Sequence, residues 1–383
     1  MASLQIVERP AEVSDLRHQH LASKTWLIFL VCRRLRGVRA KACTLKRSTV
    51  WEGFSVILRQ RGAVRAILNG AIFSVLLGPI AAHAADKWRY GVVEAKGDAG
   101  LIFMPSRFGN KYDLDIEMVE FASSTTPVKA LISGDIDAFT ASPSVALTAM
   151  SRGGALKFVG CNWPGATYTL YGAPDIKTIA DLKGKSVGVS GPGSMPDLFT
   201  REALTEKGIS FDQVTFANAG GGSDRFRALL AGVVKATATS SEFEPEAAKH
   251  GINILAQAHL ATPMFSRNCI VTTAKTIAEK RDQLVRFLAA NMDGYDYALT
   301  HRDETNALAR KIAKLSDDDL SAVFIYDETV SQKNVDPQLA IPADRLQWIE
   351  NALARHGAID TEKDVKAFMD DSPRLAALKI RKP

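Results

Sequence analysis

From Trp88 onward, short apolar runs alternate with longer mixed stretches, several of which end at a glycine. The short runs predict β-strands, and the longer stretches predict helices. Two of the helices begin with a capping residue followed by proline, at Thr126-Pro127 and Ser142-Pro143. The first strands predicted are Trp88–Val93, Asp115–Phe121, Ala138–Thr140, Lys157–Cys161 and Tyr168–Tyr171, with helices at Leu101–Phe108, 126–134 and 142–153. This alternation favours a mainly parallel sheet covered by helices.

The same order of elements begins again near Lys185. Strands are predicted at Lys185–Val189, Gln213–Ala217, Ala236–Thr239 and Ile252–Gln257, with helices at Ser194–Lys207, Asp224–Ala231 and a third that ends at His250. Thr126–Val145 aligns without gaps on Asp224–Phe243 at an offset of 98, with five identical residues in twenty. The shared order of helix, glycine, strand and serine predicts two similar α/β lobes.

After Thr272 the chain becomes helical and has no further predicted strand. The helical segments lie around Arg281–Leu299, Thr305–Lys314, Asp317–Ile325, Ala343–Arg355 and Val365–Met369. Because these helices have no strands of their own, we expect them to pack on the first lobe.

An apolar segment behind an arginine-rich flank precedes the first predicted strand. The flank is Arg59 to Arg65, the apolar run is Ala66 to Ala82, and Ala82-His83-Ala84 forms a small-x-small site. This order predicts a secretory signal peptide over 59–84, cleaved after Ala84, and hence a periplasmic protein. An uncleaved anchor is the alternative, although seventeen residues with a proline and two glycines are few for ~30 Å of hydrocarbon.

Residues 1–58 have no evident place in the mature protein. Their apolar run Trp26–Cys32 is too short to cross a membrane, and no apolar core directly follows Arg33-Arg34, as a twin-arginine signal would need. We expect this segment to be a non-native upstream extension, from a start codon assigned too far upstream, or a disordered one.

The positive charge of the chain lies in this leader. Residues 1–84 hold 13 Lys+Arg and 4 Asp+Glu, whereas residues 85–383 hold 35 and 38. The net charge of +6 therefore does not indicate nucleic-acid binding, and no nucleic-acid partner is expected.

Two of the four cysteines, Cys161 and Cys269, follow the leader, each in a short apolar segment. An oxidising compartment would permit a disulfide between them, and two buried thiols are the alternative. No spacing typical of a metal site occurs, so we expect neither a metal nor another cofactor.

Ligands of open α/β sheets bind beyond the carboxyl ends of the strands, close to helix starts. In this chain those ends are rich in Ser, Thr and Gly, and hydroxyls and free N–H groups at helix starts favour anions. For each serine the alternative is to cap its own helix. The predicted ends are Glu94–Gly97, Thr140–Ser144, Asn162–Pro164, Ser190–Met195, Ala219–Asp224 and Ser240–Glu242.

Other side chains at these ends have two interpretations each. Trp163 either walls the cleft or packs between the lobes, and Glu94 and Glu242 either pair with a cationic ligand group or lie solvated at the surface. Arg225 either counters an anion or is a surface residue at a helix start. Few strongly cationic groups are expected to line the cleft.

The chain lacks the residue constellations of known hydrolases and nucleotide-binding enzymes. Gly-x-Ser-x-Gly and His-Glu-x-x-His are absent, and Ala219–Ser223 lacks the Gly-Lys-Ser/Thr ending of a phosphate-binding loop. The pair Asp135 and Asp137 is expected to form a turn before a strand. We therefore expect a protein that is not an enzyme.

Three blocks of sequence resemble periplasmic solute-binding proteins of ATP-binding-cassette (ABC) importers. They are Ala130–Ala138 (ALISGDIDA), Ile179–Val189 (IADLKGKSVGV) and Ala228–Gly232 (ALLAG), within a resemblance that covers about Trp88 to Trp348. The chain is most similar to the group that includes binders of nitrate, sulfonate or taurine, and thiamine-pyrimidine precursors. It departs from that group at Gly232–Ala236, which lacks the usual acidic residue.

The resemblance implies a two-lobed α/β fold, each lobe a mainly parallel sheet flanked by helices, joined by two crossing strands. The crossings are expected near Tyr171–Pro174 and Ser266–Thr272. Lobe 1 would comprise 86–172 and 270–383, and lobe 2 would comprise 173–269. The lobes are expected to close around the ligand by a hinge motion.

The implied function is capture of a small organic or inorganic anion, such as a sulfonate, nitrate, taurine-like solute or carboxylate, in the inter-lobe cleft. A monomer would deliver it to the transmembrane subunits of an ABC permease. The alternatives are a neutral pyrimidine- or thiamine-precursor-like solute, and a pyrimidine synthase-like enzyme, whose cysteine-rich loop is missing here. The family's contact positions correspond to Glu94, Ala95, Ser142, Trp163, Ser194, Ser223, Ser240 and Glu242.

Overall fold

Two five-stranded sheets form the centre of the protein in a computed structural model that describes residues 85–93 and 95–381. Their strand orders are β2-β1-β3-β10-β4 and β7-β6-β8-β5-β9. The first sheet contains β1 Asp86–Val93, β2 Leu114–Phe121, β3 Ala138–Ala141, β4 Leu156–Trp163 and β10 Asn268–Thr273. The second contains β5 Tyr168–Gly172, β6 Ser186–Val189, β7 Thr215–Asn218, β8 Ala236–Ser240 and β9 Asn253–Gln257.

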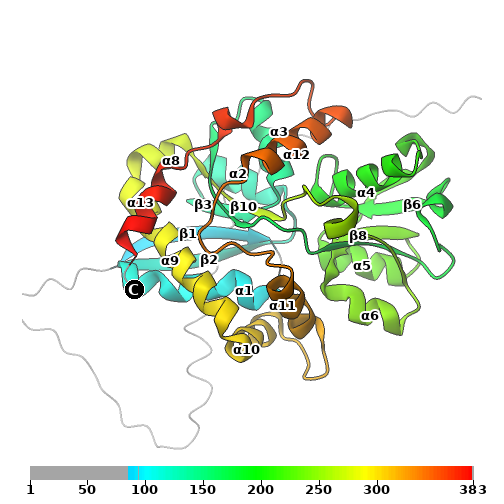
Figure 1. Cartoon of the computed structure of the whole chain (residues 1–383), viewed down its shortest axis with the longest axis horizontal. Helices are drawn as coiled ribbons and strands as arrows, with labels where there is room; N and C mark the ends of the chain where they lie inside the picture. Colours follow the sequence, from blue (N-terminus) through cyan, green and yellow to red (C-terminus); the bar gives the residue numbers. More distant parts are fainter. Residues whose placement is uncertain (1–84, 94, 382–383) are drawn as a thin grey trace, which may run out of the picture. The chain divides into compact units, whose positions relative to one another are not determined.

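Helices cover both sheets (Figure 1). Up to β10 they are α1 Ala99–Phe103, α2 Thr126–Ser133, α3 Pro143–Ser151, α4 Met195–Glu206, α5 Gly222–Leu230, α6 Glu244–Lys249 and α7 Ala258–Ala261. After β10 they are α8 Ala274–Glu279, α9 Arg281–Thr300, α10 Arg302–Ala313, α11 Ser321–Ser331, α12 Ala343–Arg355 and α13 Ser372–Ile380. Short 3₁₀ segments are Met104–Tyr112, Ile179–Leu182, Phe211–Gln213, Ser241–Phe243 and Val365–Phe368.

Each sheet has four strands in one direction and one reversed strand. In the first sheet β10 is antiparallel to both β3 and β4, and in the second β5 is antiparallel to both β8 and β9. Each reversed strand is the one that arrives from the other lobe. The expected two-lobed α/β fold with mainly parallel sheets is confirmed.

The first crossing lies earlier in the chain than Tyr171–Pro174. Tyr168–Gly172 pairs with Ser240–Ala236 on one side and with the strand Asn253–Gln257 on the other. This segment therefore belongs to the second sheet, although the sequence pattern assigns it to lobe 1, and the chain crosses at 164–167. An apolar run reveals a strand but not its partners, which explains the difference.

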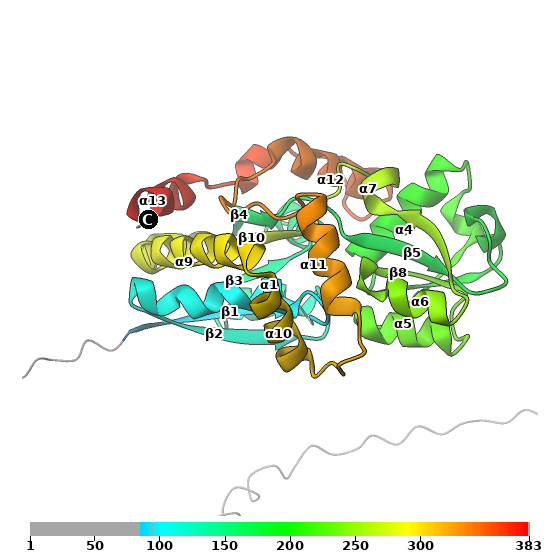
Figure 2. The same cartoon turned by 60° about the horizontal axis from the view of Figure 1, so that its bottom comes forward.

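The helices after β10 are shared between the lobes. Helices α9 and α10 contact α1 of the first lobe, whereas α11 contacts α6 and α12 contacts both α3 and α4. Figure 2 shows α11 running beside the second lobe. The expectation that all of these helices pack on the first lobe is therefore incomplete, because α11 and α12 bridge to the second.

The helix predicted at Leu101–Phe108 is shorter than expected. Helix α1 ends at Phe103, and a 3₁₀ segment that carries Pro105 near its start continues to Tyr112. Proline has no N–H to donate within a helix, so the α-helical hydrogen bonds end there.

Both faces of the first sheet are buried, because successive side chains of its central strands point to opposite faces. Ala138, Val159 and Ile270 join the apolar cluster that contains Phe287 of α9. Their chain neighbours, among them Phe139, join the cluster on the other face.

Cys161 on β4 and Cys269 on β10 form a disulfide, which settles the alternative that the sequence leaves open. The two cysteines are 108 residues apart in sequence and lie on hydrogen-bonded strands. β4 leads into the first crossing and β10 follows the second, so the bond joins the first-lobe ends of both connections.

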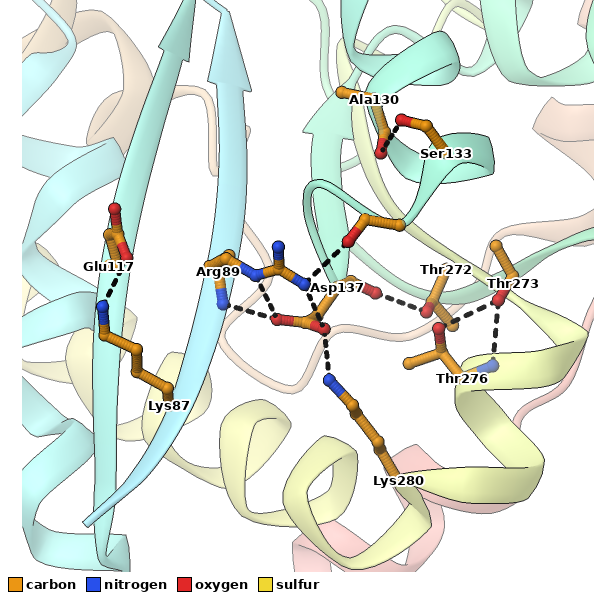
Figure 3. Close-up of polar contacts among 11 residues, drawn as sticks. Lys87, Arg89, Glu117, Ala130, Ser133, Asp137, Thr272, Thr273, Thr276 and Lys280 are labelled. Carbon is orange, nitrogen blue, oxygen red and sulfur yellow. Dashed lines mark hydrogen bonds and ion pairs between the residues drawn. The ribbon is translucent and has the colours of Figure 1, made fainter. Parts of the chain in front are cut away.

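Asp137 does more than form a turn (Figure 3). Its buried carboxylate accepts hydrogen bonds from the backbone and side chain of Arg89 and from Lys280, the last at 2.7 Å. Burial alone would raise the pKa of Asp137, but hydrogen bonds from Lys280 and Arg89 hold it below its usual value. Asp137 therefore ties β1 to the start of α9, at the end of the sheet opposite the cleft.

Candidate functional site

A cleft between the two sheets collects the carboxyl ends of their parallel strands. Its lining comes from the segments after β1, β2 and β3 in the first lobe and after β6 and β8 in the second, together with the starts of α4 and α5. The cleft encloses about 800 Å³, part of it open to solvent. This is the position that the strand directions predict for a ligand.

Hydroxyl groups dominate the polar lining. They belong to Ser123, Ser124, Thr140, Ser142, Tyr168, Ser190, Ser223, Thr239 and Ser240. Ser142 directly follows β3 and Ser240 ends the equivalent strand β8, and neither side chain caps the helical turn that follows it. These two hydroxyls are therefore not consumed by helix capping.

Arg225 is the most unusual charged group of the cleft. It lies in the first turn of α5 and is only 3% exposed. Its guanidinium donates to the carbonyls of Ala238 and Gly220, to the Ser190 hydroxyl and, at 2.9 Å, to the Tyr168 hydroxyl. All of these acceptors are neutral, and among the described residues no carboxylate forms an ion pair with Arg225.

One N–H of that guanidinium remains available. A guanidinium carries five N–H donors, and four are used by the neutral acceptors. The fifth donates no hydrogen bond within the described part of the chain. The group thus combines an uncompensated charge with a spare donor beside the cleft.

A second cation, Arg267, is already neutralised. It pairs with Asp98, donates to Thr167 at 2.6 Å and stacks on the ring of Trp163 with 4.3 Å between the guanidinium carbon and the ring centroid. Arg267 belongs to the second crossing segment, so this network fixes that segment against the first lobe.

Glu242 contacts the first lobe directly. Its Oε2 atom accepts hydrogen bonds from the backbone N–H groups of Gly97, at 2.7 Å, and Asp98, at 3.3 Å. Burial, and then the nearby Asp98 carboxylate, raise the pKa of Glu242 to about 8, against the smaller opposing effects of Arg267 and Lys96. Burial and the Asp98 carboxylate thus favour the neutral form of Glu242.

The structure brings some of the predicted site residues to the cleft and not others. Ser142, Ser223, Ser240 and Glu242 line it. Ala95 is buried beside it and donates its N–H to Glu120 at 3.2 Å. Glu94 lies outside the described residues.

Trp163 and Ser194 are buried away from the lining. Trp163 is fully buried against Arg267, which agrees with packing between the lobes rather than with a cleft wall. The Ser194 hydroxyl donates to the Gly191 carbonyl at 2.6 Å and braces the turn before α4. Neither side chain belongs to the cleft lining, and for Trp163 the structure selects the second of its two interpretations.

The expectation of few cationic groups is wrong, because Lys96, Arg225 and Arg267 all line the cleft. For Arg225 the sequence allows either a cleft position or a surface position. Its burial depends on Tyr168 and Ser190, which belong to other elements of the fold. Arg267 could have been predicted from the sequence, because it lies inside the predicted second crossing and a crossing segment borders the cleft. Lys96 also falls inside a predicted strand end, 94–97.

Residues 85–93 and 95–381 contain no group of three or more His, Cys, Asp or Glu side chains placed to hold a metal ion. In the same residues, no helix combines the length and the apolar character that a bilayer crossing requires.

The family model described as NMT1/THI5 like matches residues 108–305, slightly more than half of the chain. The chain belongs to the NMT1/THI5-like family. The match covers the whole second lobe and both crossing segments, so it includes the cleft residues from Ala122 to Asn268.

This NMT1/THI5-like protein is also similar to curated proteins of Brucella abortus, Brucella suis and Brucella melitensis, whose names describe them only as binding proteins. The identity is 29% over 132 residues, which is 34% of this chain and 38% of each relative. The chain thus spans well under two thirds of the length of these relatives.

Among solved structures, the NMT1/THI5-like protein resembles periplasmic binding proteins. The alkanesulfonate-binding protein SsuA of Xanthomonas axonopodis pv. citri, bound to MOPS, matches with a TM-score of 0.63 and 16% identity, over 74% of this chain and 98% of that one. The nitrate-binding protein NrtA of Synechocystis PCC 6803 matches with a TM-score of 0.64 and 14% identity, over 78% and 90%. At these identities the likeness establishes the two-lobed fold.

Proposed function

We propose that the protein is the solute-binding component of an ABC importer and captures a small organic or inorganic anion in its cleft. It then delivers this anion to the transmembrane subunits of a permease. The family membership, the two-lobed fold and the sulfonate- and nitrate-binding neighbours support transport binding rather than catalysis.

The main evidence for an anionic ligand is the buried charge of Arg225, which has no ion-pair partner among the described residues. Removing an ion from water costs several kcal/mol, and neutral acceptors offset only part of this cost. An anion next to the spare N–H would compensate the charge and gain a charge-assisted hydrogen bond. A sulfonate, carboxylate or nitrate fits this environment.

The rest of the lining also suits an anion. The hydroxyls around Arg225 are donors, and the starts of α3 and α5 direct free N–H groups and positive dipole ends toward the same region. The ring of Tyr168 is the one aromatic ring among the described lining residues, and its hydroxyl is engaged with Arg225. The lining therefore offers fewer favourable contacts to a stacked pyrimidine than to a small anion.

We further propose that the protein acts as a monomer in the periplasm after cleavage behind Ala84, and that it is not an enzyme. The predicted signal peptide over 59–84 supports export. Expression of the full chain followed by N-terminal sequencing of the periplasmic form would test the cleavage. A mature start well before Ala85 would contradict it.

A thermal-shift screen of the periplasmic protein tests the ligand class. The panel contains nitrate, alkanesulfonates, taurine, aromatic carboxylates and pyrimidines, and a solute that binds the native state raises the melting temperature. Arg225→Met should abolish the shift caused by an anion. Arg227→Met is the matched control, because Arg227 lies on the same helix but is exposed and paired with Asp224. A pyrimidine that shifts the wild type and Arg225→Met equally would refute the anion proposal.

A further inference from the structure

Glu242 has its two carboxyl oxygens in different surroundings. Oε2 accepts two backbone hydrogen bonds from the first lobe, from Gly97 and Asp98. Oε1 has no hydrogen-bond partner among the described residues, and Glu242 lines the cleft. Backbone N–H groups bind a carboxylate oxygen as readily as a carbonyl oxygen, so these two bonds leave the protonation state open but occupy Oε2. A proton on Glu242 is therefore placed on Oε1.

The surroundings favour that proton. Asp98 is the nearest acidic neighbour, and Arg267 is committed to Asp98 rather than to Glu242. Lys96 pairs with Asp319 at 3.5 Å and lies over the Phe243 ring. The other charged groups around the opening behind Glu242 carry both signs: Glu246 and Lys249 on α6, and Asp318 and Asp319 before α11. No cation is thus dedicated to Glu242 in the described structure.

We infer that Glu242 meets the solute as a neutral carboxylic acid whose O–H donates a hydrogen bond to an uncharged oxygen of that solute. This inference rests on the proposed function, and it narrows the ligand to an anion with a second, neutral acceptor such as a hydroxyl, ether or carbonyl oxygen. Arg225 binds the anionic end of the solute, and Glu242 donates to the neutral oxygen at its other end. An ionised Glu242 would instead select an ammonium group in that place.

Three sulfonates of equal length and different terminal groups distinguish these cases. The probes are 2-hydroxyethanesulfonate, 1-propanesulfonate and 2-aminoethanesulfonate. A longer set, 4-hydroxybutanesulfonate, 1-pentanesulfonate and 4-aminobutanesulfonate, allows for the span of the cleft. We expect the hydroxyl compound to bind at least tenfold more tightly than the methyl compound at pH 7. Its dissociation constant should rise about tenfold per pH unit above pH 8, where Glu242 loses its proton.

Glu242→Gln provides the critical variant. A glutamine oxygen still accepts from Gly97 and Asp98, and its NH₂ group donates at every pH, so binding should persist and vary less than threefold between pH 6 and 9.5. Glu246→Gln is the control, because Glu246 borders the same opening but is partly exposed and pairs with His250. It should retain the pH dependence of the wild type.

Other results would overturn the inference. Preference for the ammonium probe, or affinity that rises with pH, would mean that Glu242 binds as a carboxylate. If none of the probes binds while nitrate or another anion of the screening panel does, the inference fails and the proposed function stands. If neither the probes nor any other anion of the screening panel binds, the proposed function itself fails.

Discussion

Tyr168 accepts a hydrogen bond from Arg225 at 2.9 Å, which joins the first strand of the second lobe to the first turn of α5. Tyr168 is the residue at which the chain completes its first crossing and enters the second sheet. The orientation of the cleft guanidinium therefore depends on a strand that has just arrived from the other lobe.

Tyr168→Phe should weaken anion binding without abolishing it. Without this acceptor the guanidinium is less firmly oriented toward the cleft, and we expect a loss of roughly tenfold in affinity, or about 1.4 kcal/mol. Calorimetric titration with the best anion of the panel would measure the change. Tyr297→Phe is the control and should bind normally, because Tyr297 is a partly buried tyrosine on α9 that donates to Glu304 and does not line the cleft. Equal affinity of Tyr168→Phe and the wild type would show that this hydrogen bond does not position Arg225 for the solute.

Ser142→Leu and Ser194→Leu should have opposite effects. Ser142 lines the cleft, with its hydroxyl 3.0 Å from that of Ser144, so a leucine there fills the cleft and blocks binding with little loss of stability. Ser194 is fully buried and bonded to Gly191, so a leucine there overpacks the interior and costs about 1–3 kcal/mol. Melting temperature and ligand affinity, measured together, separate the two effects. Normal binding by Ser142→Leu would mean that the cleft is misplaced.

Glu202 should contribute a pH-dependent part of the stability. It lies on α4 and accepts hydrogen bonds from His356 at 2.7 Å and Arg355 at 2.8 Å, both on or just after α12. Burial would raise the pKa of Glu202, but His356 and Arg355 outweigh it and hold the pKa below its usual value of 4.5. Because the folded pKa is depressed, the stabilisation is complete above about pH 4.5 and is lost as the pH falls through the folded pKa.

Glu202→Gln should therefore lower the free energy of unfolding by about 1 kcal/mol at pH 7 and by less below pH 4.5. Urea unfolding of both proteins between pH 3 and 7 would measure the difference. A difference that grows toward low pH would contradict the assignment.

Asp137 and Asp135 form a matched pair for a stability test. Asp137 is buried and holds Arg89 and Lys280, whereas Asp135 is exposed and accepts a hydrogen bond from Ser133 at 2.6 Å. Asp137→Ala should cost roughly 2–3 kcal/mol, reduced from the value for a fully buried pair because Arg89 and Lys280 are partly exposed. Asp135→Ala should stay within about 0.5 kcal/mol of the wild type. Equal urea midpoints for the two variants would show that the Asp137 contacts contribute nothing.

The sequence anticipates the repeated architecture well because its signals are local. Gly134 ends α2 in a left-handed conformation, with φ of 82°, and Gly232 has φ of 71° at the equivalent place after α5. Each glycine leads into the central strand of its sheet and then to a cleft serine, Ser142 or Ser240. Such short segments are enough to predict where helices and strands end. They also predict which edge of each sheet binds a ligand.

The sequence by itself therefore determined the two-lobed α/β fold and the segments that border the cleft. The tertiary structure decided which side chains enter the cleft, because direction at a strand end depends on packing against distant elements. Trp163 turned inward to stack on Arg267, 104 positions later, and Arg225 became buried only when Tyr168 and Ser190 surrounded it. The charge of the site arises from these long-range contacts, and no pattern within one segment can encode them.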